Sequence, residues 1–159
     1  MTSSNSVNIT IHPTWNIIKE IQEKTSKFIE GLNLSKDFSD STVMCATELI
    51  ENAIKYGSEK PGGGNIEFNL NTDGKKIVIM ISNGVRSEDE IRVCVMHIEK
   101  IKNSKDPSAL YTERLKELMK NPKPGVSQLG LYRIAYEGKF RLDYTYRDRV
   151  LTITACRKI

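Results

Sequence analysis

Three polar side chains in the segment ELIENAIKYG, which runs from Glu48 to Gly57, have residue types and spacing suited to binding a magnesium nucleotide. On a helix, Glu48 and Asn52 share one face and lie about 6 Å apart along the axis. Lys55 follows Asn52 by three residues and stays near that face. An amide oxygen can ligate Mg²⁺, a nearby carboxylate can accept a proton from a hydroxyl, and a lysine can neutralise phosphate oxygens. The segment is therefore a candidate catalytic site.

The same segment also fits an ordinary amphipathic helix. Leu49 and Ala53 have the spacing of a buried stripe. Glu51 and Lys55 are four residues apart, so they can form an exposed ion pair worth about 0.3–0.5 kcal/mol. Glu48 would then simply be solvated. The spacing alone leaves both interpretations open.

Helices and hairpins are predicted in separate blocks along the rest of the chain. Apolar residues with helical spacing predict one helix that ends near Gly31 and a second from about Asp37 to Tyr56. Alternating segments on both sides of Asp73–Gly74 predict a hairpin, and the segments KFRLDYTY and RVLTITACRK predict another at the end. Residues 1–6 are expected to form a loose tail, and residues 86–125 a polar, largely helical insertion.

Strands in adjacent pairs, with helices in separate blocks, favour the α+β class. We expect a two-layer α/β sandwich in which a mixed, mostly antiparallel sheet carries helices on one face. The length of 159 residues favours a single domain over residues 1–159.

The composition argues against several functional classes. The net charge is only +4 and basic residues are interleaved with acids, so nucleic acid is not an expected partner. No apolar run approaches the roughly 18–20 residues that span a bilayer, and the first residues lack a secretory signal. We therefore expect no membrane partner and a cytoplasmic location. Cys45, Cys94 and Cys156 lack metal-ligand spacing and are expected to be buried, reduced thiols.

Three segments resemble, in the right order, the motifs of the histidine-kinase-like (GHKL) ATPase superfamily. ELIENAIKYG resembles the N-box, and the strand IVIMIS followed by NGV resembles the first glycine box, usually D-x-G-x-G. GVSQLGLYRIA resembles the second glycine box, usually G-x-G-L-G-L. Residues 86–125 fall where the family carries its ATP lid. The resemblance covers roughly residues 36–159 and implies a histidine-kinase-like ATPase fold that binds ATP and Mg²⁺.

The resemblance also implies a role for each matching residue. It assigns Glu48 to the general base, Asn52 to the magnesium ion and Lys55 to phosphate. The adenine-reading aspartate of the family falls on Ser82, and Asn83 is an alternative polar contact. The other nucleotide contacts that it implies are Gly84, Gln128, Leu129, Gly130 and Leu131.

Within the superfamily, the segments DPSALYTERLKELM, ISNGV and SQLGLYRIAYEGKFRLDYTY are similar to those of the SiaB-type protein kinases. This similarity implies a protein serine/threonine kinase that phosphorylates a small partner protein in a bacterial signalling switch, and a homodimer is compatible with it. Ser82, Arg86 and Gln128 depart from the family pattern. They favour the alternative, a non-catalytic protein-interaction module of anti-sigma-factor type whose nucleotide site has degenerated. Neither His12 nor His97 has the setting of a phosphoacceptor, and we expect His97 to be a surface or packing residue of a helix.

Overall fold

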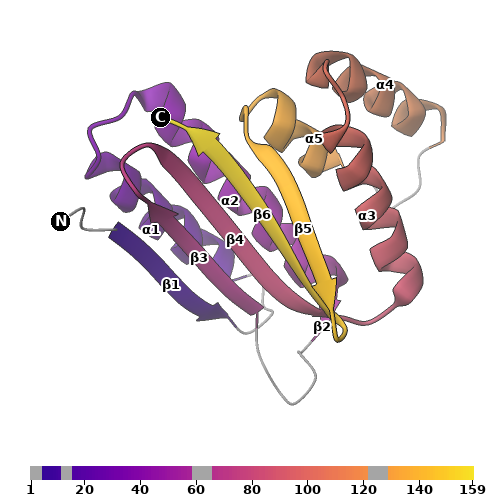
Figure 1. Ribbon diagram of the computed structural model, residues 1–159, viewed down its shortest axis with the longest axis horizontal. Helices are drawn as coiled ribbons and strands as arrows, with labels where there is room; N and C mark the ends of the chain where they lie inside the picture. The colour runs from indigo at the N-terminus through magenta and orange to yellow at the C-terminus, as the bar shows by residue number, and fades with distance from the viewer. Residues whose placement is uncertain (1–4, 12–15, 59–65, 122–128) are drawn as a thin grey trace.

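The computed structural model describes residues 5–11, 16–58, 66–121 and 129–159, and every strand pairing within them is antiparallel. The strands are β1 (Asn5–Ile11), β2 (Gly57–Ser58), β3 (Ile66–Thr72), β4 (Lys76–Val85), β5 (Arg141–Arg147) and β6 (Val150–Lys158). They form one sheet in the order β1-β3-β4-β6-β5, with the short β2 beside β4 (Figure 1). The predicted α+β fold with a mostly antiparallel sheet is confirmed.

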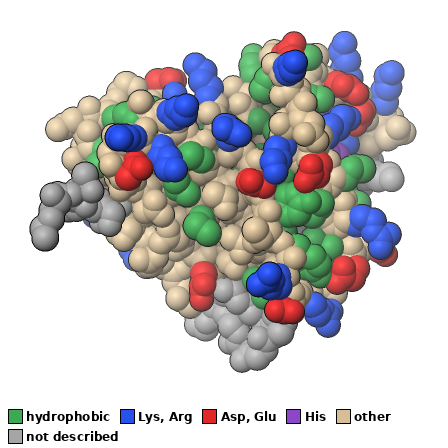
Figure 2. All heavy atoms as spheres, viewed as in Figure 1, with side chains coloured by type: hydrophobic (Ala, Val, Ile, Leu, Met, Phe, Trp, Pro, Cys, Tyr) green, Lys and Arg blue, Asp and Glu red, His purple; other side chains and the backbone are tan. Residues whose placement is uncertain are grey.

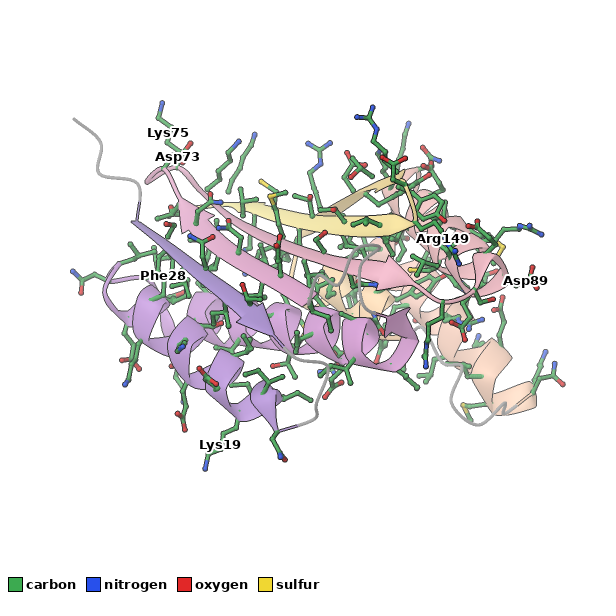
Figure 3. All side chains as sticks on the ribbon, turned by 90° about the horizontal axis from the view of Figure 1, so that it is seen from below. Lys19, Phe28, Asp73, Lys75, Asp89 and Arg149 are labelled. Atoms are coloured by element: carbon green, nitrogen blue, oxygen red, sulfur yellow. The ribbon has the colours of Figure 1, made fainter. Side chains whose placement is uncertain are left out.

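The helices cover one face of this sheet. They are α1 (Ile17–Glu30), α2 (Lys36–Tyr56), α3 (Glu88–Lys102), α4 (Pro107–Lys120) and α5 (Leu129–Tyr136). Seen edge-on in Figure 3, α1 and α2 lie on one side of the strands, and Lys19 on α1 points away from them. The predicted two-layer sandwich is therefore confirmed. No helix of the described ranges combines the length and apolar character needed to cross a membrane.

The alternation of β4 determines which side chains can reach the helical layer. Ile77, Ile79 and Ile81 are at most 1% exposed and face the helices. The intervening side chains, among them Met80 and Ser82, face the open side of the sheet. Figure 2 shows this open face, on which uncharged side chains cover much of the area over β3 and β4.

Helix α2 lies at the centre of the core and carries the candidate site residues Glu48, Asn52 and Lys55. Leu49 and Ile50 of α2 are fully buried in the same cluster as Phe68, Ile79 and Leu131. Each such side chain contributes about 1.5–3 kcal/mol when it is removed from water. The position of α2 against the sheet is therefore strongly fixed, and so are the side chains next to its buried stripe.

Two segments differ from the sequence expectation. Asn5 and Ser6, assigned to the loose tail, begin β1, because they continue the antiparallel register and pair with Thr72 and Asn71 of β3. The insertion is helical as expected, but α3 is not polar all round. It buries five side chains, namely Ile91, Cys94, His97, Ile98 and Ile101, whereas α4 buries none. Thus α3 belongs to the helical layer of the sandwich, and α4 packs outside it, mainly against α5.

Candidate functional site

Glu48 is held in an ion pair between α2 and α5. Its Oε1 accepts a hydrogen bond from Arg133 Nη1 at 2.7 Å, and the Glu48 side chain is only 17% exposed. Arg133 also bonds Glu137, the residue that follows α5, through Nε at 3.2 Å. The sequence did not predict a role for Arg133. Its spacing of three residues from Gly130 was the available signal, because residues three apart share a helix face.

Gly130 brings the first turn of α5 against the Glu48 carboxylate. A Cβ atom at this glycine would lie 2.9 Å from the carboxyl carbon Cδ of Glu48 and closer still to Oε2. Real side chains essentially never approach so closely, so only glycine permits the Glu48 carboxylate to lie in this position against α5. The fold therefore brings together two of the predicted site residues, Glu48 and Gly130.

Burial controls the proton affinity of this carboxylate. Loss of water raises the pKa of Glu48 above its ordinary value, and the nearby Arg133 guanidinium opposes that rise. A raised pKa makes a carboxylate a better proton acceptor near neutral pH. Glu48 therefore has a raised proton affinity, and Arg133 holds its carboxylate in one orientation.

Asn52 and Asn83 line a small cavity on the sheet side of α2. Asn52 Nδ2 is buried and has no hydrogen-bond partner among the described residues. Asn83 is 5% exposed, and its Nδ2 donates to the carbonyl oxygen of Gly84 at 2.8 Å. The cavity between them has a volume of about 30 Å³, and Ile91 and Cys94 of α3 form another wall. The lining of this cavity is largely apolar. An unpartnered buried amide costs about 1–3 kcal/mol, so a group that hydrogen-bonds to Asn52 Nδ2 would be favoured there.

The structure does not bring Ser82 together with Asn52. Ser82 lies on the open face of the sheet, where its Oγ accepts a hydrogen bond from Thr152 Oγ1 at 3.1 Å. Successive side chains of a strand point to opposite faces, so the side chain that faces the helices is that of Asn83. The adenine contact proposed for Ser82 is therefore not supported by this geometry, while the alternative residue, Asn83, lies on the same side of the sheet as Asn52.

The remaining predicted residues occupy the ends of the two helices and of β4. Lys55 lies in the exposed last turn of α2, where its carbonyl oxygen accepts a hydrogen bond from Arg86 Nη2 at 2.5 Å. Arg86, which departs from the family motif, thus caps the C-terminus of α2 with a positive charge. Gly84 is buried in β4, and Leu129 and Leu131 belong to α5. Gln128 lies outside the described residues.

His97 is a packing residue, in agreement with the sequence expectation. It is 5% exposed, and its Nδ1 is 2.6 Å from the hydroxyl oxygen of Tyr132 on α5. Burial, followed by the charges of Arg114 and Lys100, lowers the pKa of His97 to about 4. Neutral His97 therefore links α3 to α5.

We expect this link to weaken at low pH. The folded pKa of His97 is about 4 and the unfolded value about 6.5, so its contribution is complete above pH 6.5 and is lost as the pH falls toward 4. Between pH 7 and pH 5 the free energy of unfolding should fall by up to about 2 kcal/mol through this group. Urea denaturation of wild type and His97→Gln at both pH values measures it. His12→Asn provides the matched control, and equal pH slopes in wild type and His97→Gln would contradict the assignment.

No protein-family model matches this chain, and no curated protein matches it. Among solved structures, the chain is similar to a chain of the SiaB–SiaC complex from Pseudomonas aeruginosa. The two superpose with a TM-score of 0.67 at 20% sequence identity, over 98% of this chain and 89% of that chain. This similarity supports the fold over nearly the whole length. At this identity it speaks for the fold alone.

Proposed function

We propose that this chain is an ATP-dependent protein serine/threonine kinase that acts on a small partner protein. The observation that carries the proposal is Glu48, a mostly buried carboxylate with a raised pKa that is oriented by Arg133 and lies against the first turn of α5. The similarity to a chain from a complex of two proteins supports a protein partner. Phosphoryl transfer depends mainly on positioning and charge stabilisation, so few side chains are needed.

The donor chemistry on α2 fits magnesium and a nucleotide. The described residues hold no cluster of three or more His, Cys, Asp or Glu side chains that could bind a metal by itself. Mg²⁺ commonly keeps several waters and takes one or two protein oxygens together with substrate phosphates, so the Asn52 amide is a sufficient protein ligand. When bound, magnesium nucleotide supplies the transferable phosphoryl group and the charge that stabilises it. The Asn83 side chain offers polar groups to the adenine base of the nucleotide. Lys55 lies one turn beyond Asn52 on α2.

The volume of the pocket requires a conformational change. The space between Asn52 and Asn83 measures about 30 Å³, whereas small-molecule sites measure about 300–1,000 Å³. Ile91 and Cys94 of α3 pack into that region. We infer that α3 moves away from the sheet before nucleotide enters, which is the behaviour of a lid. Glu48 then accepts the proton of the partner's Ser or Thr hydroxyl.

A second candidate function is a non-catalytic module that binds a partner without nucleotide. The small cavity favours it, and so does the Glu48–Arg133 ion pair, because the carboxylate is already engaged. The two candidates differ in whether magnesium nucleotide stabilises the folded chain.

Thermal unfolding with MgATP separates the candidates. Nucleotide at about 100 times its dissociation constant should add about 2.7 kcal/mol of stability. Asn52→Leu should lose this shift and at the same time stabilise the free protein by about 1–2 kcal/mol, since it removes an unpartnered buried amide. Ser82→Ala is the matched control and should keep the shift, because Ser82 faces the opposite side of the sheet. Absence of any shift in wild type at millimolar MgATP would leave the non-catalytic module.

A further inference from the structure

A separate cavity of about 540 Å³ lies where α3, α4 and α5 meet the start of β5, the upper right region of Figure 1. Its size falls within the range of small-molecule sites. Much of its lining is apolar, contributed by Ile101, Pro107, Ala135, Phe140 and Leu142. It shares no lining residue with the cavity between Asn52 and Asn83. It is therefore distinct from the proposed nucleotide pocket.

Positive charge lines this cavity. Lys102, Lys139 and Arg141 all belong to its wall. One acid, Asp106, also belongs to the wall, where it caps α4 by accepting a hydrogen bond from Ala109 N. A second acid, Asp143, pairs with Lys102, with its Oδ1 2.9 Å from Lys102 Nζ. The hydrogen bond from Lys102, and to a smaller extent the charge of Arg141, lower the pKa of Asp143. Neither Arg141 nor Lys139 forms a salt bridge with a described residue. Two cations thus remain available for an anion.

The turn that carries Lys139 is fixed by the end of α5. Lys139 has a φ of 59°, which is uncommon for a residue other than glycine. Its neighbours hold the turn closed, because Gly138 N donates to Arg133 O and Phe140 N donates to Ile134 O, both at 3.1 Å. A Cβ at Gly138 would lie 2.7 Å from the Ile134 carbonyl oxygen, so the turn has little freedom. Lys139 is consequently presented from a rigid backbone.

We propose that this cavity binds a small organic anion with an apolar body, such as an aromatic phosphate or carboxylate. The apolar lining takes the body, and Lys139 and Arg141 take the charge. Helix α5 connects the cavity to Glu48, since it is about 12 Å long. Ala135 and Tyr136, at the C-terminal end of α5, line the cavity. Gly130 in the first turn and Arg133 in the middle of the same helix contact Glu48. The anion therefore acts as an effector of the Glu48 site. The binding step is independent of the proposed kinase function, and only the effector role rests on it.

Phenyl phosphate titrated into the ¹⁵N-labelled chain tests the proposal. We expect saturable shifts of the amide signals of Tyr136, Lys139 and Arg141. Inorganic phosphate, which lacks the apolar body, and benzyl alcohol, which lacks the negative charge, should both bind more weakly. The double variant Lys139→Gln/Arg141→Gln should weaken phenyl phosphate at least tenfold. Lys75→Gln/Arg149→Gln is the matched control, because these cations lie at the two hairpin turns (Figure 3).

The outcomes separate the two parts of the proposal. Unchanged amides around the cavity, or equal affinity of the double variant and wild type, would overturn the anion site. Inorganic phosphate binding as tightly as phenyl phosphate would also overturn it, since surface charge alone would then explain the binding. Shifts that reach Gly130 and Arg133 support the effector role, and shifts confined to the cavity refute it. None of these results depends on the response to MgATP.

Discussion

Replacing Gly130 by alanine should reduce MgATP turnover at least 100-fold while changing the free energy of unfolding by only about 1–2 kcal/mol. The added Cβ would lie 2.9 Å from Glu48 Cδ, so the carboxylate must rotate away from Arg133. Losing a hydrogen bond between charged groups costs about 1.5–3 kcal/mol. Alanine in place of glycine in a helix recovers about 1 kcal/mol. The two changes partly offset each other in stability, but the general base is displaced.

Gly31→Ala is the matched control. A Cβ at Gly31 would lie 3.5 Å from its nearest neighbour, the carbonyl oxygen of Phe28, which is an ordinary contact. We expect this variant to match wild type in two measurements. One is the turnover of MgATP to ADP, in which water replaces the partner's hydroxyl, and the other is urea denaturation. In the Gly130→Ala background, Glu48→Asp withdraws the carboxylate by one methylene, so it should relieve the steric clash without restoring turnover. Wild-type turnover by Gly130→Ala would show that the base does not depend on this contact.

Local periodicity was sufficient to predict most of the fold. The helical spacing of α2 and the alternation of β3 and β4 are properties of neighbouring residues, and they respond to the same burial that stabilises the structure. The hairpin of β5 and β6 was also predictable. Its two turn residues, Asp148 and Arg149, adopt left-handed φ values of 53° and 62° although neither is a glycine. The local sequence pattern did not predict that Asn5 and Ser6 belong to β1, because their pairing with β3 depends on residues far away in the chain.

The candidate site was only partly predictable, for two physical reasons. The first is register: a shift of one residue along a strand exchanges its faces. Motif alignment placed the adenine contact at Ser82, whereas the alternation of Ile79 and Ile81 already pointed to Asn83 on the helical side. The second is distance along the chain. Arg133 is 85 residues from Glu48, and no local pattern reports an ion pair of that kind.

The Glu48–Arg133 ion pair leads to the other large prediction. Glu48→Gln should lower MgATP turnover by about 10²- to 10⁴-fold, since an amide cannot accept the proton. Its effect on stability should be small, because Arg133 keeps its ion pair with Glu137. Glu51→Gln is the matched control on the same helix and should retain turnover. Equal turnover in wild type and Glu48→Gln would show that Glu48 is not the base.

Arg133→Met, unlike Glu48→Gln, should have a clear effect on the stability of the folded chain. It leaves Glu48 mostly buried without its cation, so the pKa of Glu48 should rise further and stability should fall by about 1–3 kcal/mol at pH 7. A raised folded pKa favours the folded state below the unfolded value and loses that advantage as the pH rises through the folded pKa. The loss should therefore be largest near neutral pH and shrink toward pH 4. In Glu48→Gln/Arg133→Met position 48 no longer carries a carboxylate, so the pH dependence of the Arg133→Met effect should disappear. If it persists in the double variant, another group is responsible for the pH dependence, and Arg133 does not set the charge of Glu48.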